Sequence, residues 1–155
     1  MDAERAPHIR ILPHSQKEFP SQDFLQTWLI TALKARAGIY RLRSKDAIAD
    51  LAAGSIALFR YGDYIVGEAI VRGYARQEFT ERMLSGDTER YEAYITFVPE
   101  SVRLFAPPMP IEELQKLVGI EHPLTVARTY FKISDWSIYP KVIAYVAERG
   151  RLITC

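Results

Sequence analysis

The sequence predicts one α+β domain, in which a small, curved, mostly antiparallel β-sheet closes toward a barrel and is flanked by helices. Three observations lead to this prediction. The chain has 155 residues, enough for one hydrophobic core and few for two. Short runs rich in β-branched and aromatic residues fill its middle, and runs with helical spacing stand before and after them. Gly67 interrupts one apolar run, as expected of a strand that bulges or bends.

The N-terminal stretch, residues 1–20, is expected to be a flexible lead-in. It contains one run with strand character, His8 to Leu12, and is otherwise polar or interrupted by proline. No run in the chain approaches the ~20 apolar residues of a membrane span, and the charged start lacks the apolar stretch of a signal peptide. Cys155 is the single cysteine, which excludes an intramolecular disulfide. We therefore expect a cytoplasmic protein.

A helix is expected from about Gln22 to Ala37. Ser21 is a suitable N-cap, and Gly38 stops the pattern at the other end. Trp28 lies on the apolar face, so we expect it to pack in the core and not against a ligand. The apolar residues that recur at helical spacing are Phe24, Leu25, Trp28, Leu29, Ala32 and Leu33.

Strand character begins after this helix. The expected strands are Ile39 to Leu42, Ser55 to Tyr61 and Tyr64 to Tyr74. Gly62-Asp63 separates the last two as a two-residue hairpin turn does. Lys45 to Leu51 is expected to form a short helix between the first two strands.

The next segments are expected to leave the sheet and then return to it. Arg76 to Arg90 is polar and irregular, with a helical turn around Phe79 to Leu84, and is predicted to be an excursion from the sheet. Strands are expected again at Tyr91 to Phe97 and Ser101 to Phe105. Pro107-Pro108 should end the second of these, because proline cannot donate a hydrogen bond to a neighbouring strand.

The C-terminal part is predicted to alternate between helix and strand. A helix should open at Pro110 and stop at Gly119. A strand from Val126 to Ile133 follows. The last helix is expected from Tyr139 to Glu148, and Arg151 to Thr154 is expected to return as an edge strand.

Motifs for cofactor binding or catalysis are absent from the sequence. There is no P-loop, no Gly-x-Gly-x-x-Gly, no His-Glu-x-x-His, no Cys-x-x-Cys and no Gly-x-Ser-x-Gly. His8, His14 and His122 lie far apart in the chain, so we expect exposed loop histidines and not a metal site or triad. Glu112-Glu113 falls in the first turn of a helix, where negative charge is stabilising. We therefore expect no cofactor, no metal and no catalytic residue.

Charge also limits the function. Lys and Arg exceed Asp and Glu by only one, 20 to 19, so no global field attracts phosphates. Any nucleic-acid contact must use a local patch. The near-neutral charge favours the alternative of a protein–protein interaction module, as a homodimer or within a larger complex. An enzyme has the least support, because no nucleophile, base or metal set is visible.

The central runs occur in a known order. Gly54-Ser-Ile-Ala-Leu-Phe-Arg-Tyr61 is followed by Tyr64-Ile-Val-Gly-Glu-Ala-Ile-Val71, and later by Pro110-Ile-Glu-Glu-Leu114 before the last helix. This order resembles the PUA-like superfamily, and most of all its EVE domains and their YTH relatives. The resemblance covers about two-thirds of the chain. It makes residues 21–37 an added N-terminal helix or part of an interface, since they precede the usual start of the family.

The resemblance implies a nucleic-acid reader that accepts a modified base in an aromatic pocket beside a basic surface, with DNA or RNA as the partner. Strand ends on either side of the connection from Ser44 to Gly54 should meet at one rim. Alternation also allows Tyr40 to face the core while Arg41 and Arg43 are solvated. The candidate ligand-binding residues are Tyr40, Tyr61 and Trp136 as walls and Arg43, Ser44, Lys45 and Arg60 at the mouth.

Overall fold

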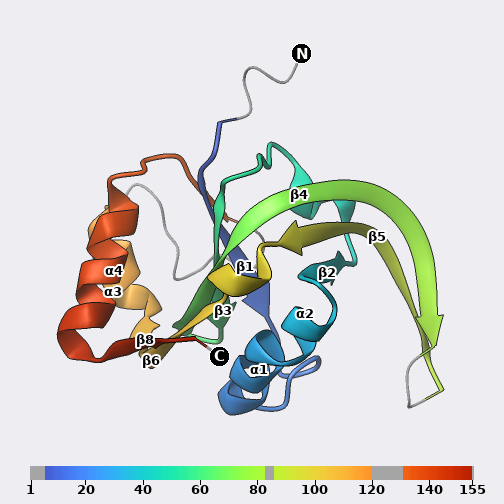
Figure 1. Cartoon of the computed structure of the whole chain (residues 1–155), viewed down its shortest axis with the longest axis horizontal. Helices are drawn as coiled ribbons and strands as arrows, with labels where there is room; N and C mark the ends of the chain where they lie inside the picture. The colour runs from blue at the N-terminus through green and yellow to red at the C-terminus, as the bar shows by residue number, and fades with distance from the viewer. Residues whose placement is uncertain (1–5, 83–85, 120–130, 155) are drawn as a thin grey trace.

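The structure is a computed structural model that describes residues 6–82, 86–119 and 131–154 (Figure 1). In chain order its elements are β1 (Ile9–His14), α1 (Gln22–Ile30), α2 (Ala32–Ala35), β2 (Ile39–Leu42), η1 (Lys45–Ile48), β3 (Ile56–Tyr61), β4 (Tyr64–Arg82), β5 (Thr88–Phe97), η2 (Pro99–Ser101), β6 (Arg103–Pro110), α3 (Ile111–Val118), β7 (Phe131–Ile133), α4 (Ile138–Arg149) and β8 (Arg151–Ile153).

The strands of the described residues form one eight-stranded sheet in the order β2-β5-β4-β3-β1-β7, with β6 pairing to β4 and β8. Every pairing is antiparallel except that of β1 with β3. The predicted α+β class and the mostly antiparallel sheet are confirmed. The expected closure toward a barrel is not, because β2 and β7 lie at opposite ends of the strand order and the sheet stays open.

The long strand β4 joins the two halves of the sheet and arches across the molecule in Figure 1. Its first part pairs with β3 and β6, and its second part pairs with β5. At Gly67 a Cβ atom would lie 2.6 Å from the backbone oxygen of Arg103, so no side chain fits without a backbone shift. The register with β3 also shifts there, between Phe59 and Arg60. The irregularity predicted at Gly67 is therefore present.

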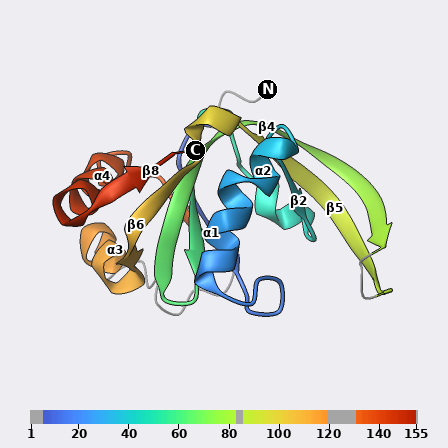
Figure 2. The same cartoon turned by 60° about the horizontal axis from the view of Figure 1, so that its bottom comes forward.

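Two hydrophobic clusters lie on opposite faces of the central strands. Helices α1 and α2 cover one face, and α3 and α4 cover the other (Figure 2). Alternation along β3 supplies both clusters, with Phe59 in the first and Leu58 in the second. All six residues of β3 are buried. This strand is thus the centre of the fold, and both helical layers pack against it.

Strand β1 corrects the expectation of a flexible N-terminal lead-in. Ile9–His14 pairs with β3 on one side and β7 on the other, and five of its six residues are buried. The strand character predicted at His8 to Leu12 is confirmed, but a strand with both faces covered shows no alternation that would tell which face is buried, so its place in the sheet was not foreseen. His8 and His14, predicted to be exposed, are 2% and 8% exposed. His122 lies outside the described residues.

The predicted first helix is present but interrupted. It divides at Thr31, whose hydroxyl donates a hydrogen bond to the carbonyl oxygen of Thr27 (2.6 Å). Ser21 is the N-cap, and its hydroxyl accepts from the backbone N–H of Phe24 (3.1 Å). Trp28 was predicted to pack in the core. It is only half-buried, although its ring meets those of Phe19 and Tyr40 edge to face.

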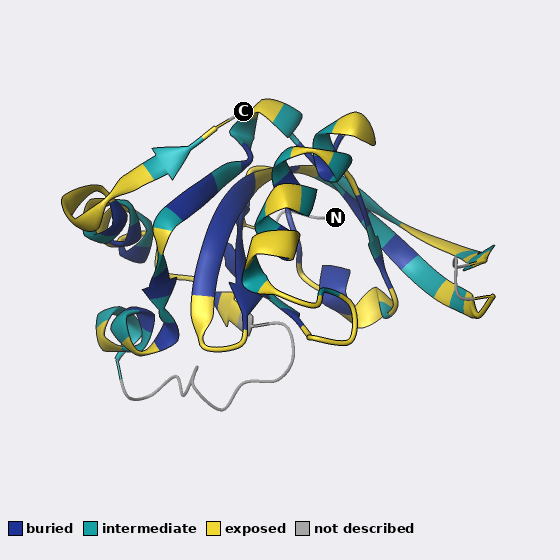
Figure 3. Cartoon of the chain, turned by 90° about the horizontal axis from the view of Figure 1, so that it is seen from below, coloured by how far each residue is buried: buried dark blue, intermediate teal, exposed yellow. Residues whose placement is uncertain are grey.

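The segment from Arg76 to Arg90 was predicted to leave the sheet, and this prediction is wrong. Strand β4 continues to Arg82, and β5 starts at Thr88. The ring of Phe79 stacks on that of Tyr91 across the two strands, with 5.2 Å between centroids. Both faces of this outer hairpin are largely exposed (Figure 3), so its sequence lacks the hydrophobic alternation of a half-buried strand.

The remaining elements follow the predictions closely. The hairpin turn at Gly62-Asp63, the helix between Pro110 and Gly119, the last helix and the edge strand after it are confirmed. Strand β6 differs, since it runs through Pro107-Pro108 to Pro110. Of the strand predicted from Val126, only Phe131–Ile133 falls within the described residues. Among all the residues that the structure describes, no helix is both long and apolar enough to cross a membrane.

Candidate functional site

The two tyrosines predicted to line a pocket are core residues. Tyr40 is 8% exposed, and its hydroxyl donates to Nε2 of His14 (2.5 Å). Tyr61 is 9% exposed, and its hydroxyl donates to the carbonyl oxygen of Phe19 (2.7 Å). Both belong to the cluster beneath α1 and α2. Tyr40 therefore has the inward orientation that strand alternation allowed, and neither ring offers a free face to a base.

His14 is the buried polar centre of this region. Because a carbonyl can only accept, Nδ1 carries the hydrogen and donates to the backbone oxygen of Arg60 (3.1 Å), while Nε2 accepts from Tyr40. Burial lowers the pKa of His14 to about 4, and the hydrogen bond to Arg60 only partly opposes this shift. The imidazole is therefore neutral at pH 7 and serves as a structural link between β1, β2 and β3.

The four residues predicted at the mouth of the pocket lie in two separate regions of the structure. Arg43 forms an ion pair with Glu89 (3.3 Å), and the backbone N–H of Lys45 donates to a carboxylate oxygen of Glu92 (3.2 Å), so both lie beside β5. Ser44 is the N-cap of η1. Arg60 is 8% exposed, and its Nε donates to the carbonyl oxygen of Gly62 in the turn between β3 and β4 (2.7 Å).

Trp136 lies apart from the other predicted residues, next to α4. It is 39% exposed, and its ring meets that of Tyr139 edge to face at 6.2 Å. Tyr139 packs against the cluster on the other face of the sheet from Tyr40 and Tyr61. The structure therefore does not bring the seven predicted residues together around one pocket.

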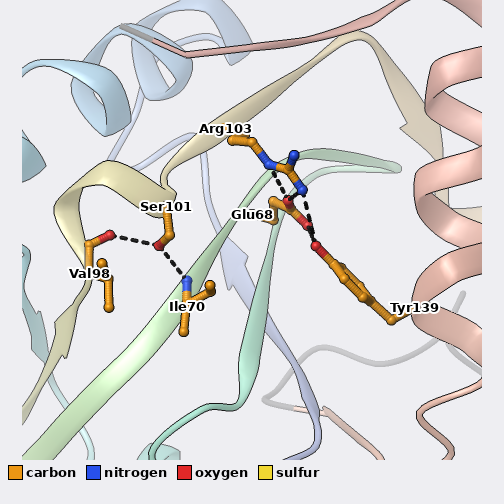
Figure 4. A network of polar contacts seen from close by, with 6 residues as sticks. All are labelled: Glu68, Ile70, Val98, Ser101, Arg103 and Tyr139. Carbon is orange, nitrogen blue, oxygen red and sulfur yellow. Dashed lines mark hydrogen bonds and ion pairs between the residues drawn. The ribbon is translucent and has the colours of Figure 1, made fainter.

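Tyr139 also belongs to a polar network that fixes α4 to the sheet (Figure 4). Its hydroxyl donates to the carboxylate of Glu68 (2.7 Å), whose side chain is only 3% exposed. Nε of Arg103 donates to the same carboxylate (2.7 Å). Burial, followed by the hydrogen bond to Glu68, raises the pKa of Tyr139 to about 12. Among the described residues no buried side-chain nitrogen or oxygen lacks a partner, so this network needs no ligand to satisfy its buried atoms and we assign it a structural role.

A concave surface that we call the sheet groove lies on the outer face of β2, β5 and β4. It encloses about 520 Å³ and is lined by Ala37, Ile39, Arg41, Arg72, Gln77, Phe79, Tyr94 and Thr96. The alternation of β5 explains its composition, because Ile95 and Phe97 are buried in the core while Tyr94 and Thr96 point to the other side. The groove is therefore the exposed side of the strands whose inner side covers the core.

Cations and aromatic rings are interleaved in the sheet groove. The guanidinium of Arg41 lies 5.0 Å from the centroid of the Phe79 ring and is also ion-paired with Glu81. Arg72 is exposed and forms no ion pair with any described residue. Tyr94 lies directly across from Arg41 on the neighbouring strand. This arrangement presents flat rings and positive charge on one surface.

Sequence reasoning missed part of this surface. Arg41 was expected to be a solvated neighbour of Tyr40, but Arg72, Phe79 and Tyr94 had no assigned role. Phe79 fell in the predicted excursion, so its pairing with β5 was not foreseen. The alternation of Tyr94 and Thr96 with buried Ile95 and Phe97 is the sequence pattern that could have predicted an exposed sheet face here.

A second hollow, the α1 groove, lies on the outer side of the first helix. It encloses about 370 Å³ and is lined by Ser21, Asp23, Phe24, Thr27, Trp28, Thr31 and Ala32. Phe24 is 52% exposed. Among the residues described, no group of three His, Cys, Asp or Glu side chains is placed to hold a metal ion.

Comparison with known proteins identifies the fold. No protein-family model and no curated protein matches the sequence. Protein Atu2648 from Agrobacterium tumefaciens superposes with a TM-score of 0.55 and 14% identity, over 90% of this chain and 92% of that one. An ASCH protein from Zymomonas mobilis superposes with a TM-score of 0.50 and 8% identity, over 88% and 94% of the two chains. These likenesses show that this chain shares the fold of the two proteins, whereas the resemblance to the PUA-like superfamily, and to its EVE and YTH domains, stays a prediction.

Proposed function

We propose that this protein binds nucleic acid, DNA or RNA, in single-stranded form, through the sheet groove. The observation that carries the proposal is the placement of Arg41 and Arg72 beside Phe79 and Tyr94 on one exposed sheet face. Stacking of a base on an aromatic side chain contributes about 1 to 3 kcal/mol and tolerates any base. Arginine contacts to phosphates add an attraction that weakens with salt. The groove supplies both kinds of contact within one surface.

The neighbouring end of β2 extends this surface. Arg43 follows Arg41 on the same side of the chain by alternation, and Lys45 stands at the start of η1. Both side chains are exposed. We propose that both contact the phosphate backbone, in keeping with their predicted place at the mouth of a site. Phe79 and Tyr94, and not Tyr40 and Tyr61 as predicted, are the residues on which we propose that bases stack.

Recognition of a modified base is a finer part of the proposal, which rests on the resemblance to EVE and YTH domains. Such recognition needs a ring held by aromatic side chains and by hydrogen bonds to its edge. Phe79 and Tyr94 supply the rings in the sheet groove, and Gln77 supplies an amide at its wall. Parallel titrations with oligonucleotides that differ only in base modification test this part separately.

Titration of labelled oligonucleotides, followed by fluorescence anisotropy, tests the proposed function. Tyr94→Ala should weaken binding of a single-stranded oligonucleotide by about 5- to 150-fold, the equivalent of one lost stack. Arg72→Ala should weaken all sequences about equally and reduce the salt slope by about 1. Phe24→Ser, in the α1 groove, is the matched control and should bind as the parent does. The proposal fails if both groove variants retain the affinity and salt slope of the parent.

The same Phe24→Ser variant tests the second candidate function, a protein–protein interaction module. The α1 groove favours it, because the exposed ring of Phe24 and the half-buried ring of Trp28 form an apolar surface without a covering element among the described residues. If the parent binds no oligonucleotide and is a homodimer that Phe24→Ser converts to a monomer, the interaction module replaces the nucleic-acid reader.

A further inference from the structure

Arg10 is a buried cation without a carboxylate partner among the described residues. It is 5% exposed and lies in β1, with neighbours paired on both sides. Its guanidinium donates to two neutral acceptors, the carbonyl oxygen of Ala49 and Nε2 of His8. No carboxylate oxygen of the described residues forms an ion pair with it. Burial of a charge without a counter-charge is costly, so this arrangement calls for an explanation.

His8 accepts a hydrogen bond from Arg10 but does not neutralise its charge. Arginine only donates, so Nε2 of His8 accepts (3.2 Å), and Nδ1 carries the hydrogen and donates to the carbonyl oxygen of Ala6 (3.2 Å). Burial lowers the pKa of His8, and the positive charges of Arg10 and Lys132 lower it further. His8 is therefore a neutral acceptor, and the positive charge of Arg10 remains uncompensated at short range.

A second cation lies beside Arg10. Lys132 of β7 is the residue directly paired with it across the antiparallel ladder, so the two side chains leave the sheet on the same face. Like charges in directly opposed positions destabilise a sheet unless something separates or neutralises them. Lys132 also makes no ion pair in the described part of the chain. Asp50 lies close enough to act on Arg10 through space, without a hydrogen bond or ion pair between the two side chains.

The neighbours of Arg10 on the other side are small. Ala57 of β3 pairs with Arg10, and Ala69 of β4 pairs with Ala57, so the two positions that follow Arg10 across the sheet on this side carry only methyl groups. The carbonyl oxygen of Ala49, in the segment after η1, accepts a hydrogen bond from the guanidinium and fixes its orientation. The guanidinium is thus held in place before any ligand arrives, which lowers the entropic cost of binding.

We propose that Arg10 and Lys132 form a binding site for a phosphate group, where β1, β7 and the Ala49–Asp50 turn meet. The oxygens of a tetrahedral oxyanion accept from a guanidinium and an ammonium at once and neutralise both charges. The site lies on the inner face of the sheet, whereas the sheet groove lies on the outer face of β2, β5 and β4. It is therefore a site beyond the one assigned to nucleic-acid bases.

Thermal unfolding and isothermal titration with inorganic phosphate test the proposal, against sodium chloride at matched ionic strength. Phosphate should raise the Tm of the parent above its value in chloride. Lys132→Met should weaken phosphate binding by about tenfold, the loss of one charge-assisted contact, and Arg10→Met should abolish it. Arg151→Met, an exposed cation on β8, is the control and should bind phosphate as the parent does. Tyr94→Ala should also keep phosphate binding, which separates this site from the proposed function.

Two further measurements decide among the outcomes. A nucleoside 5′-monophosphate and a short oligonucleotide, each tested with Lys132→Met, show whether the phosphate is free or part of a nucleotide, and loss of affinity in either supports the site. A purely structural Arg10 would make Arg10→Met less stable while phosphate leaves the parent unchanged. The proposal is overturned if phosphate and chloride give the same Tm for the parent, or if Lys132→Met binds every phosphate ligand as tightly as the parent does.

Discussion

A fall in pH from about 7 to about 4 is expected to remove about 3 kcal/mol of stability through His14. In the unfolded chain this histidine titrates near 6.5, whereas burial lowers its pKa to about 4 in the folded state. Below pH 6.5 the unfolded state therefore binds a proton that the folded state does not. The stabilising contribution is complete above pH 6.5 and is lost progressively as the pH approaches 4. The folded and unfolded pKa values differ by about 2.5, which corresponds to a loss of about 3 kcal/mol in the free energy of unfolding.

Urea unfolding at several pH values, for the parent and for His14→Gln, measures this effect. The amide of glutamine donates and accepts, as the histidine does toward Arg60 and Tyr40, but it does not titrate. We expect His14→Gln to be less stable than the parent at pH 7 and to lose less stability between pH 7 and 4. His8, whose pKa is also lowered by burial, contributes to the fall in both proteins. Parallel curves for the two proteins would contradict the assignment to His14.

Gly38→Ala is expected to destabilise the fold by about 2 to 5 kcal/mol. Gly38 joins α2 to β2 with φ of +82°, a conformation that costs other residues about 1 to 2 kcal/mol. An added Cβ would also lie 2.0 Å from the carbonyl oxygen of Phe97, so the backbone must shift, at a further cost of about 1 to 3 kcal/mol. The same shift would disturb the hydrogen bond from the backbone N–H of Phe97 to Gly38 (2.8 Å).

Gly62→Ala is the matched control for this prediction. Gly62 has φ of +58° in the turn between β3 and β4, and a Cβ there would meet no atom within 4 Å. Its cost should therefore be only the conformational one, about 1 to 2 kcal/mol. Urea unfolding of the two variants separates the effects. Equal losses would show that the contact between Gly38 and Phe97 does not limit what fits at this position.

Elements with local signals could be predicted from the sequence. Gly62-Asp63 marks the hairpin, Pro110 and Gly119 bound a helix, and Tyr139 begins the last one within a residue of where the structure has it. Strand β1 was recognised as a run with strand character, His8 to Leu12, but its place inside the sheet could not be predicted, because its parallel partner is more than forty residues away. The outer hairpin, formed by the end of β4 and the start of β5, was not predicted for the opposite reason, because both its faces meet solvent.

The candidate site was partly predictable for the same reasons. The solvated alternative for Arg41 and Arg43 follows from alternation with Tyr40 and Leu42, and the structure shows both tyrosine and leucine buried. Phe79 could join Arg41 only once β4 was known to continue beyond Arg76. Trp136 was predicted to be a wall of the pocket, but its place beside α4 depends on packing that no local pattern encodes.

The central claim is that nucleic acid lies across the sheet groove, and photo-crosslinking tests it most directly. Ultraviolet irradiation of the protein with a single-stranded oligonucleotide joins bases to the aromatic residues on which they stack. Mass spectrometry of the digested complex then locates the joined residues. The predicted result is crosslinking at Phe79 and Tyr94, lost when a competing unlabelled oligonucleotide is added. Crosslinks confined to Trp136 or Phe24, with none in β4 or β5, would contradict the claim.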